Sequence, residues 1–369
     1  MLKWLIWLGC LGVALLQARA WRRDAARADR LVASRPTEPP KITPMPRVSV
    51  LVAAWNAADW IERHVASVRS LRYPGVQYVL CAGGPDGTYA LAEKAMAGWG
   101  VLLRQAPGEG KQRALRKALA CATGDVIYLT DADCILDDLS FGLVIARVAA
   151  GADAATGRVR PPDDDLARRP IVWCQWSSEY YAHAHVGDEE SGLQGANCAV
   201  ARSALARAGD FSADVATGTD YHLARSLIGA GVAIAVARGS AVVTAYPTRL
   251  SEYARRQSRW LRNLWQHGSR SGDTPMKQHA ARTWAVGAVL LGLPLGAPVL
   301  GRWALAPWFL MVLHGALSRV RYLAFLARAE RRSVPIAAWV LAPAWLFVDG
   351  WVWTRSLANQ LNAAAREAW

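Results

Sequence analysis

The sequence lacks any grouping of cysteines that would indicate a disulfide-rich fold or a structural zinc site. Six cysteines are scattered over 369 residues, with no pair at metal-ligand spacing. Internal repeats and low-complexity tracts are also absent. We interpret the cysteines as small buried hydrophobic residues in a protein of a reducing compartment. They are Cys10, Cys81, Cys121, Cys134, Cys174 and Cys198.

A continuous basic surface, which nucleic-acid binding would require, is missing as well. The net charge is +14, but all of it comes from residues 1–40, 248–282 and 318–333. Each of these stretches flanks an apolar run, as the positive-inside rule and attraction to anionic headgroups predict. We therefore exclude nucleic acid as a partner and expect a lipid bilayer.

The composition indicates a membrane protein. Apolar residues make up 53% of the chain, which is high for a soluble enzyme. Residues 2–16 are apolar except for Lys3, and arginines follow them. Because a signal peptide carries its charge before the apolar core, we predict a retained membrane anchor over residues 1–18, followed by a cytoplasmic domain. The span is short, so both a tilted and a partly interfacial helix remain open.

A linker and an α/β domain come next. Residues 19–46 are basic and then proline-rich, and the prolines of residues 31–46 predict a stiff linker. Over residues 47–247, short apolar runs alternate with helical patterns. This alternation predicts a mixed, mostly parallel sheet flanked by helices, with ligands at the carboxyl ends of the strands. The expected strands are 48–54, 77–81, 101–103 and 126–130, and the expected helices are 57–70, 88–98 and 111–122.

The last third of the chain predicts membrane-associated helices. Basic residues 248–283 are expected to form interfacial helices, residues 284–355 to form C-terminal membrane helices, and residues 356–369 to form a tail. The apolar runs are 285–300, 303–317 and 335–353. The first two together exceed a bilayer core as one helix, so we expect a tight hairpin at Gly301 and Arg302. Asp349 is costly in lipid, and it either faces a cavity or belongs to an interfacial helix.

The strongest motif is Asp131-Ala132-Asp133, directly after the expected strand at 126–130. Two carboxylates at a strand end can bring oxygen ligands to one hard cation, Mg2+ or Mn2+, which offsets the charge of a diphosphate. Most Asp-x-Asp pairs are solvated loop acids, so the motif alone is weak. Its position at the carboxyl end of a sheet strand favours metal binding.

Three more positions suit a nucleotide. Lys111 begins a helix after a glycine-containing turn, where free N–H groups and an ammonium suit phosphate. Asn56 and Asp86 follow the first and second expected strands. Ordinary turn chemistry explains each of the three equally well.

Asp220 and a basic cluster complete the candidates. Asp220 precedes a helical pattern, so it is either part of a helix cap or a general base for an acceptor hydroxyl. Arg256, Arg259 and Trp260 lie just before the apolar runs. Membrane anchoring explains them, yet arginine also suits a diphosphate. The histidines form no ligand cluster.

In this order the motifs resemble the family 2 glycosyltransferases of the GT-A fold, over roughly residues 47–265. The elements that carry the resemblance are residues 48–56, Gly110-Lys111, Asp131-Ala132-Asp133, Gly195-Ala196-Asn197, Asp220 and Arg256-x-x-Arg259-Trp260. The last element is similar to that of the membrane branch, which includes ceramide glucosyltransferases and cellulose and hyaluronan synthases.

The resemblance implies an inverting, metal-dependent hexosyltransferase. Asp131 and Asp133 would hold the cation, and Asp220 would deprotonate the acceptor. Arg256, Arg259 and Trp260 would close over the diphosphate and the acceptor. The implied donor contacts are Ala54, Asn56, Asp86, Lys111, Asp131, Ala132 and Asp133, and the implied acceptor contacts are Gly195, Asn197 and Trp260.

Two positions depart from the family pattern. Ala82-Gly83 replaces the acidic residue that usually follows the second strand, which leaves Asp86 as the candidate substitute. Thr219 stands before the expected base, where the family usually has Glu. A secondary acidic contact is therefore missing at that position.

The leading hypothesis is transfer of one sugar from a nucleotide sugar, expected to be a UDP-sugar, to a membrane lipid. Candidate acceptors are a sphingolipid, a hopanoid, diacylglycerol or polyprenyl phosphate. The enzyme would be multi-pass in the cell (inner) membrane, with its catalytic domain cytoplasmic. A processive polysaccharide synthase is the alternative among enzymes, although three apolar runs are few for a channel. The alternative of another class is an inactive, membrane-tethered nucleotide-sugar-binding scaffold, against which the three aspartates argue. The sequence leaves the sugar, the lipid and the oligomeric state open.

Overall fold

A computed structural model describes residues 2–361, apart from residues 191, 214, 216, 271, 302 and 304. The chain forms two compact units that are interleaved along the sequence. The sheet unit consists of Arg35–Pro162 and Val186–Ala245. The helical unit consists of Met1–Ser34, Asp163–His185 and Tyr246–Trp369.

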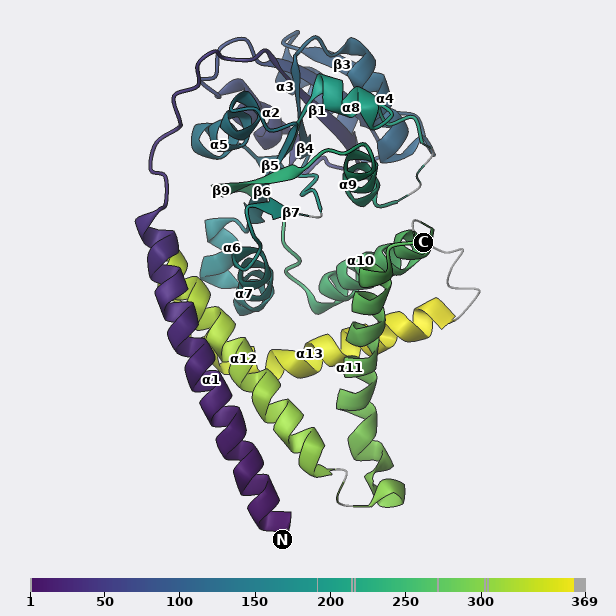
Figure 1. Cartoon of the computed structure of the whole chain (residues 1–369). Coiled ribbons are helices and arrows are strands. Elements are labelled where there is room, and N and C mark those ends of the chain that lie inside the picture. Colours follow the sequence, from purple (N-terminus) through teal and green to yellow (C-terminus); the bar gives the residue numbers. More distant parts are fainter. Residues whose placement is uncertain are drawn as a thin grey trace. The chain divides into compact units, whose positions relative to one another are not determined.

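The sheet unit is built on a mixed, mostly parallel sheet (Figure 1). Its strands are β1 (Val48–Trp55), β2 (Gln77–Gly83), β3 (Val101–Arg104), β4 (Val126–Asp131), β5 (Cys134–Ile135), β6 (Ala154–Arg160), β7 (Glu189–Glu190), β8 (Cys198–Ala201) and β9 (Ile234–Thr244). The strand order is β3-β2-β1-β4-β8-β6-β9-β5, and β7 also pairs with β9. The strands β3, β2, β1 and β4 run parallel, as do β6 and β9. Strand β8 is antiparallel to both of its neighbours, so the parallel half of the sheet ends at β4.

Helices cover both faces of this sheet. They are α2 (Ile61–Arg69), α3 (Thr88–Met96), α4 (Gly110–Cys121), α5 (Asp138–Ala149), α8 (Arg202–Arg207) and α9 (Thr219–Gly229). In Figure 1, α2 and α5 lie on one face, and α4, α8 and α9 lie on the other. Because side chains alternate along a strand, Ile127 and Leu129 of β4 pack in the core beneath α4, α8 and α9. Tyr128 points the other way and contacts Phe141 of α5, with ring centroids 4.8 Å apart.

The predicted fold class is confirmed. The four expected strands form with ends shifted by no more than two residues, and the helix expected from residue 57 begins at Ile61. The antiparallel strand β8 was not predicted. It has only four residues, Cys198–Ala201, and such a short run carries little periodic signal.

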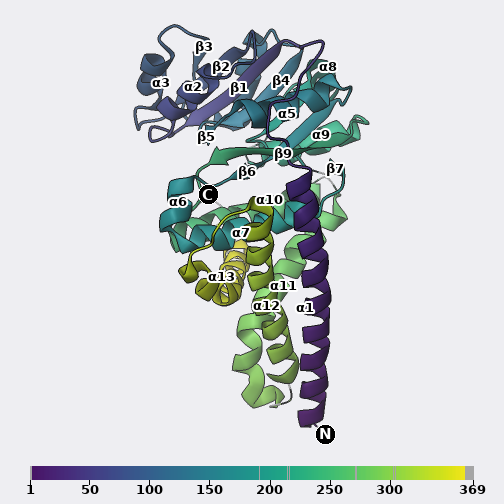
Figure 2. The ribbon, with the colours of Figure 1, turned by 90° about the vertical axis from the view of Figure 1, so that its left-hand side faces the viewer.

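The helical unit contains the membrane candidates. Its helices are α1 (Leu2–Ala33), α6 (Asp163–Arg168), α7 (Pro170–Ala184), α10 (Leu250–Arg270), α11 (Thr274–Leu300), α12 (Leu305–Glu330) and α13 (Ile336–Leu361). Among the described helices, α11, α12 and α13 are each long and apolar enough to cross a membrane. Helices α1 and α12 lie side by side (Figures 1 and 2).

Two boundaries differ from the expected ones. Helix α1 continues to Ala33, so residues 19–33 of the predicted linker are helical. The reason is that alanine and arginine favour helix, and the first proline is Pro36. Helix α11 ends at Leu300 and α12 begins at Leu305, so the chain leaves the helical conformation at Gly301, where a hairpin is expected. Arg302, the other residue of the expected hairpin, lies outside the described residues. In the expected tail, α13 extends to Leu361, and residues 362–369 also lie outside them.

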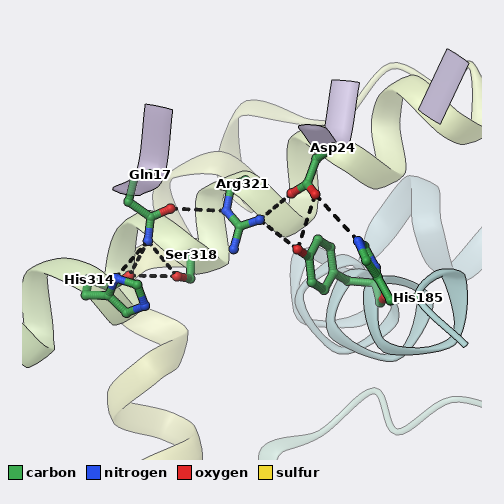
Figure 3. Close-up of polar contacts among 7 residues, drawn as sticks. Gln17, Asp24, His185, His314, Ser318 and Arg321 are labelled. Carbon is green, nitrogen blue, oxygen red and sulfur yellow. Dashed lines mark hydrogen bonds and ion pairs between the residues drawn. The ribbon is translucent and has the colours of Figure 1, made fainter. Parts of the chain in front are cut away.

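Buried ion pairs join α12 to its neighbours. Figure 3 shows Arg321 of α12 between Gln17 and Asp24 of α1. Arg321 pairs with Asp24, and its Nε donates to Gln17 Oε1 at 3.1 Å. Arg319, two residues earlier, pairs with Asp349 of α13, which is 1% exposed. The expectation that Asp349 faces a cavity is therefore wrong, because an arginine from a neighbouring helix covers and neutralises it. The other expectation, that the helix carrying Asp349 lies at the membrane interface, stays a prediction.

Candidate active site

The Asp-Ala-Asp motif lies at the carboxyl edge of the parallel half of the sheet. Asp131 is the last residue of β4 and is in register with Ala53 of β1. Ala132 is buried in the turn that follows, and Asp133 precedes β5. Both carboxylates are partly exposed. The motif therefore stands where parallel sheets bind ligands.

Lys111 contacts this motif directly. It lies in the first turn of α4, and its Nζ is 2.5 Å from Asp131 Oδ1. The two side chains are 38% and 35% exposed, so a ligand can reach both. Burial lowers the pKa of Lys111, but the charges of Asp131 and Asp220 outweigh it and raise the pKa above its usual value. The lysine thus remains a cation beside two carboxylates.

Asp220 and Gly195 are neighbours on the same side. Asp220 is the second residue of α9, and its Oδ1 accepts the backbone N–H of Tyr221 at 2.9 Å. A Cβ added at Gly195 would lie 3.0 Å from Asp220 Cβ. The loop that carries Gly195 is held to β4, because Thr130 Oγ1 donates to Ala196 O at 2.9 Å. Glycine at 195 therefore leaves the space that Asp220 occupies.

One small pocket joins these groups. Lys111, Gly195 and Asp220 line it together with Thr130, and Leu115, Leu129, Leu193, Cys198, Thr219 and Leu223 supply the rest of its wall. The structure thus brings together Lys111, Asp131, Gly195 and Asp220, which are more than 100 residues apart at the extremes. An apolar wall beside charged groups reduces solvent screening of the charges.

Asn197 has a structural position. It is fully buried, and its Oδ1 accepts the hydroxyl of Tyr128 at 2.7 Å. Its Nδ2 donates to Arg158 O at 2.8 Å and to Ser240 Oγ at 2.9 Å. The amide is therefore used within the sheet. Asn197 holds the loop of Gly195 in place and does not face the pocket.

Asn56 and Asp86 lie in two neighbouring loops, which follow β1 and β2 and are connected by hydrogen bonds. Asp86 accepts the N–H of Ala58 at 3.0 Å and the hydroxyl of Thr88 at 2.7 Å. Burial raises the pKa of Asp86, but the hydrogen bonds from Thr88 and Ala58 outweigh it and lower the pKa. Asn56 has a φ of 56°, a conformation that asparagine tolerates. Turn chemistry accounts for the contacts of both residues, and Ala54 is buried in β1 beside them.

At Gly83, the departure from the family pattern at Ala82-Gly83 coincides with a steric limit. A Cβ at Gly83 would lie 2.3 Å from the carbonyl oxygen of Gln105 and 2.9 Å from the Trp55 ring. No acidic side chain fits at position 83 in this backbone. The nearest carboxylate past β2 is therefore Asp86, three residues later.

The two carboxylates fit a hard divalent cation. Among the described residues no group of three or more His, Cys, Asp or Glu side chains gathers as a metal site. Magnesium-type sites commonly use one or two carboxylates and take their other ligands from substrate phosphates and water. Asp131 and Asp133 match that pattern, and Lys111 supplies the positive charge that a diphosphate would also contact.

Arg256, Arg259 and Trp260 belong to the helical unit. They lie on α10, where Arg256 Nη2 is 3.5 Å from Glu179 Oε1 of α7. Arg259 is exposed, and Trp260 is 47% exposed. The rings of Trp260 and His279 are nearly perpendicular, with centroids 5.6 Å apart. The motif therefore combines one residue held by a neighbouring helix with two that face outward.

The apolar wall of the pocket was missed in the sequence. Leu193 and Cys198 come from the loop before β8 and from β8 itself, and Leu223 comes from α9. No spacing connects them to Lys111 or Asp131. The sequence contains only a weak signal for the lining of this pocket. Two of its residues, Thr130 and Thr219, directly precede Asp131 and Asp220.

Comparison with known families decides the classification. The profile described as "Glycosyltransferase like family 2" matches residues 46–263, more than half of the chain. The chain belongs to this glycosyltransferase family. The matched region includes every residue of the resemblance noted from the sequence, from the strand at 48–54 to Trp260.

One of the similar solved structures supports the fold of this family 2 chain. A mannosyltransferase from Pyrobaculum calidifontis, in complex with GDP-Man and Mn2+, is similar at 21% identity and a TM-score of 0.50, over 99% of each chain. Mannosyl-3-phosphoglycerate synthase from Rubrobacter xylanophilus has 17% identity and a TM-score of 0.41, over 62% of this chain and 75% of that one. Glucosyl-3-phosphoglycerate synthase from Mycobacterium tuberculosis, with Mn2+, UDP and phosphoglyceric acid, has 17% identity and a TM-score of 0.41, over 67% and 82%. No curated protein sequence matches the chain.

Proposed function

We propose that this family 2 chain moves one sugar from a nucleotide sugar to a membrane lipid, with inversion at the anomeric carbon. The observation that carries the proposal is the contact of Lys111 with Asp131, beside a pocket that Lys111 shares with Asp220. This arrangement combines a phosphate-binding cation, a carboxylate metal ligand and a candidate base at one edge of the sheet.

The roles of the side chains follow from their chemistry. Asp220 accepts the proton of the acceptor hydroxyl, which attacks the anomeric carbon, and the nucleoside diphosphate leaves. Lys111 contacts the diphosphate and offsets its charge. A divalent cation at Asp131 and Asp133, Mg2+ or Mn2+, supplies further charge neutralisation for the leaving group.

A lipid acceptor is supported by the helical unit. Three described helices, α11, α12 and α13, are long and apolar enough to cross a bilayer, and the basic stretches flank them as in cytoplasm-facing segments. We assign Arg256, Arg259 and Trp260 to the diphosphate and acceptor side, Asn56 and Asp86 to the nucleoside side, and a cytoplasmic place to the catalytic domain of residues 47–247.

The test is a transfer assay with product identification. Purified protein in detergent is incubated with UDP-sugars and GDP-mannose, the latter because the Pyrobaculum calidifontis structure contains it. A total lipid extract supplies acceptors, and mass spectrometry identifies the products. We expect a lipid carrying one added sugar, and no product from Asp220→Asn at unchanged donor binding.

Other outcomes contradict specific parts of the proposal. Products longer than one or two sugars would favour a processive synthase. Donor binding without any transfer would favour a scaffold. Full activity of Asp220→Asn would remove Asp220 as the base.

A further inference from the structure

Helix α10 is attached to the rest of the helical unit by polar contacts that form a circuit, closed through two adjacent residues of α7. We call this circuit the polar ring. It runs from α10 to α13, then to α12, to α7 and back to α10. Its members are Tyr253, Asp349, Arg319, Ser178, Glu179 and Arg256.

The first half of the polar ring is buried. The hydroxyl of Tyr253 donates to Asp349 Oδ1 at 2.5 Å, and Tyr253 is 5% exposed. Asp349 also pairs with Arg319, whose Nη1 donates to Ser178 Oγ at 2.6 Å. Burial, and then the charge of Asp349, hold the pKa of Tyr253 well above its ordinary value, so the hydroxyl remains a donor.

The second half of the polar ring connects α7 to α10 through Glu179, the residue after Ser178. Glu179 Oε2 accepts the hydroxyl of Tyr246 at 2.6 Å, and its Oε1 is 3.5 Å from Arg256 Nη2. The guanidinium of Arg256 also lies 5.0 Å from the centre of the Tyr246 ring. Arg256 is therefore held by a carboxylate and by an aromatic face.

The two members of the polar ring on α10 are placed so that they affect the orientation of this helix. Tyr253 and Arg256 are three residues apart, so they lie on neighbouring positions of one helix face. Contacts at both positions restrict the rotation of α10 about its axis, in addition to the packing of Leu261 and Leu264 against α11. That rotation determines the direction of Arg259 and Trp260, one turn further on, and both of these side chains are exposed.

We propose that Asp349 and Arg319 are positioning residues that set the orientation of the Arg256-x-x-Arg259-Trp260 motif for sugar transfer. The proposal rests on the function proposed above. Neither residue belongs to the matched family region, residues 46–263, so the motif depends on partners outside that region. A buried charge pair suits this role, because a partner left alone in a low dielectric is costly, and few orientations of α10 satisfy both groups.

The chain offers a matched control for a merely stabilising role. Arg321 lies two residues after Arg319 on α12 and pairs with Asp24 (Figure 3). This pair is buried to a similar extent as the pair of Arg319 with Asp349. The pair Arg321–Asp24 joins α12 to α1, and Arg321 Nη1 also donates to Tyr181 of α7 at 2.7 Å. Within the part of the chain that the structure describes, neither side chain of this pair has a hydrogen bond or ion pair to α10. Asp24→Asn therefore removes a comparable pair without touching the motif helix.

The experiment compares Asp349→Asn, Tyr253→Phe and Asp24→Asn in the full chain in detergent. Hydrogen exchange of α10 and steady-state transfer kinetics are measured for each variant. For Asp349→Asn we expect α10 amides to exchange about tenfold faster. We also expect kcat to fall about tenfold, since a group misplaced by about 1 Å can cost up to about 10²-fold in rate. Donor KM should rise, because the displaced arginines are those assigned to the donor diphosphate. Tyr253→Phe, which leaves no uncompensated charge, should give the same pattern more weakly.

The control separates positioning from stability. Asp24→Asn should lower the thermal midpoint yet leave α10 exchange and kcat within about twofold. Unchanged α10 exchange in both ring variants overturns the proposal, as does an equal loss of kcat in Asp24→Asn. Faster α10 exchange with full kcat also overturns it. If the wild-type protein transfers no sugar at all, the proposed function fails, while the exchange data still decide whether the polar ring fixes α10.

Discussion

The contact between Gly195 and Asp220 gives a quantitative test of the candidate base. Gly195→Ala would place a Cβ 3.0 Å from Asp220 Cβ and 3.7 Å from its Oδ2. Carbon atoms pack best at about 3.5–4.0 Å. Asp220 Cβ moves only with the backbone, so the first turn of α9 must retreat by roughly 0.5 Å.

The size of the effect follows from this displacement. A misplacement of about 1 Å at a reacting group can cost up to about 10²-fold in rate. For a shift of half that size we expect a loss of about tenfold in kcat, equivalent to about 1.4 kcal/mol in the activation barrier. Donor binding should be unchanged, because the added methyl group touches neither Asp131 nor Lys111 among its nearest atoms.

The assay measures kcat and donor KM for sugar transfer, with the thermal midpoint as a folding control. Gly229→Ala is the matched variant, because it lies in the same helix α9 and a Cβ there meets nothing within 4 Å. It should keep full activity. Full kcat in Gly195→Ala, or an equal loss in both variants, would refute the assignment of Asp220 to the reacting site.

Three further predictions concern charge and stability. Lys111→Gln removes the ammonium beside Asp131, so Mn2+ should bind more tightly without donor in calorimetry while turnover falls; weaker Mn2+ binding would contradict this. Asn197→Ala leaves the buried Tyr128 hydroxyl without its acceptor, and the free energy of unfolding should fall by about 2–3 kcal/mol in denaturant titrations; a loss below about 0.5 kcal/mol would contradict the structural role. Burial lowers the pKa of His64 to about 4 from its ordinary 6.5. As the pH falls, the unfolded chain takes up this proton at a higher pH than the folded protein does. The free energy of unfolding should therefore decrease by up to about 3 kcal/mol between about pH 6.5 and 4. In His64→Gln this decrease must be smaller.

The parallel half of the sheet was predictable because its signals are local. The runs at β1, β2 and β4 are continuous and apolar, and the helices between them have their own periodicity. Asp131 and Asp133 could be placed at a strand end for the same reason. Their contact with Lys111 could not, because it depends on where α4 begins relative to β4.

Long-range contacts explain most of what the sequence did not predict. Gly195 meets Asp220 because the short antiparallel strand β8 brings the preceding loop beside β4. Asp349 is the single charged residue of its apolar run, and its partners Arg319 and Tyr253 lie 30 and 96 residues away. Asn197 was placed on the acceptor side from its motif, but its side chain is used within the sheet. Contacts between residues so far apart in the chain produce no regular spacing in the sequence that could predict them.

The most direct test of the central claim is the dependence of sugar transfer on a divalent cation at the Asp131–Asp133 pair. Transfer by the purified protein is measured after chelation and again after Mn2+ or Mg2+ is restored, in parallel with Asp131→Asn and Asp133→Asn. We predict that chelation abolishes transfer by the wild-type protein, that the cation restores it, and that neither variant recovers. Full turnover in excess chelator, or full activity in both variants, would contradict the account.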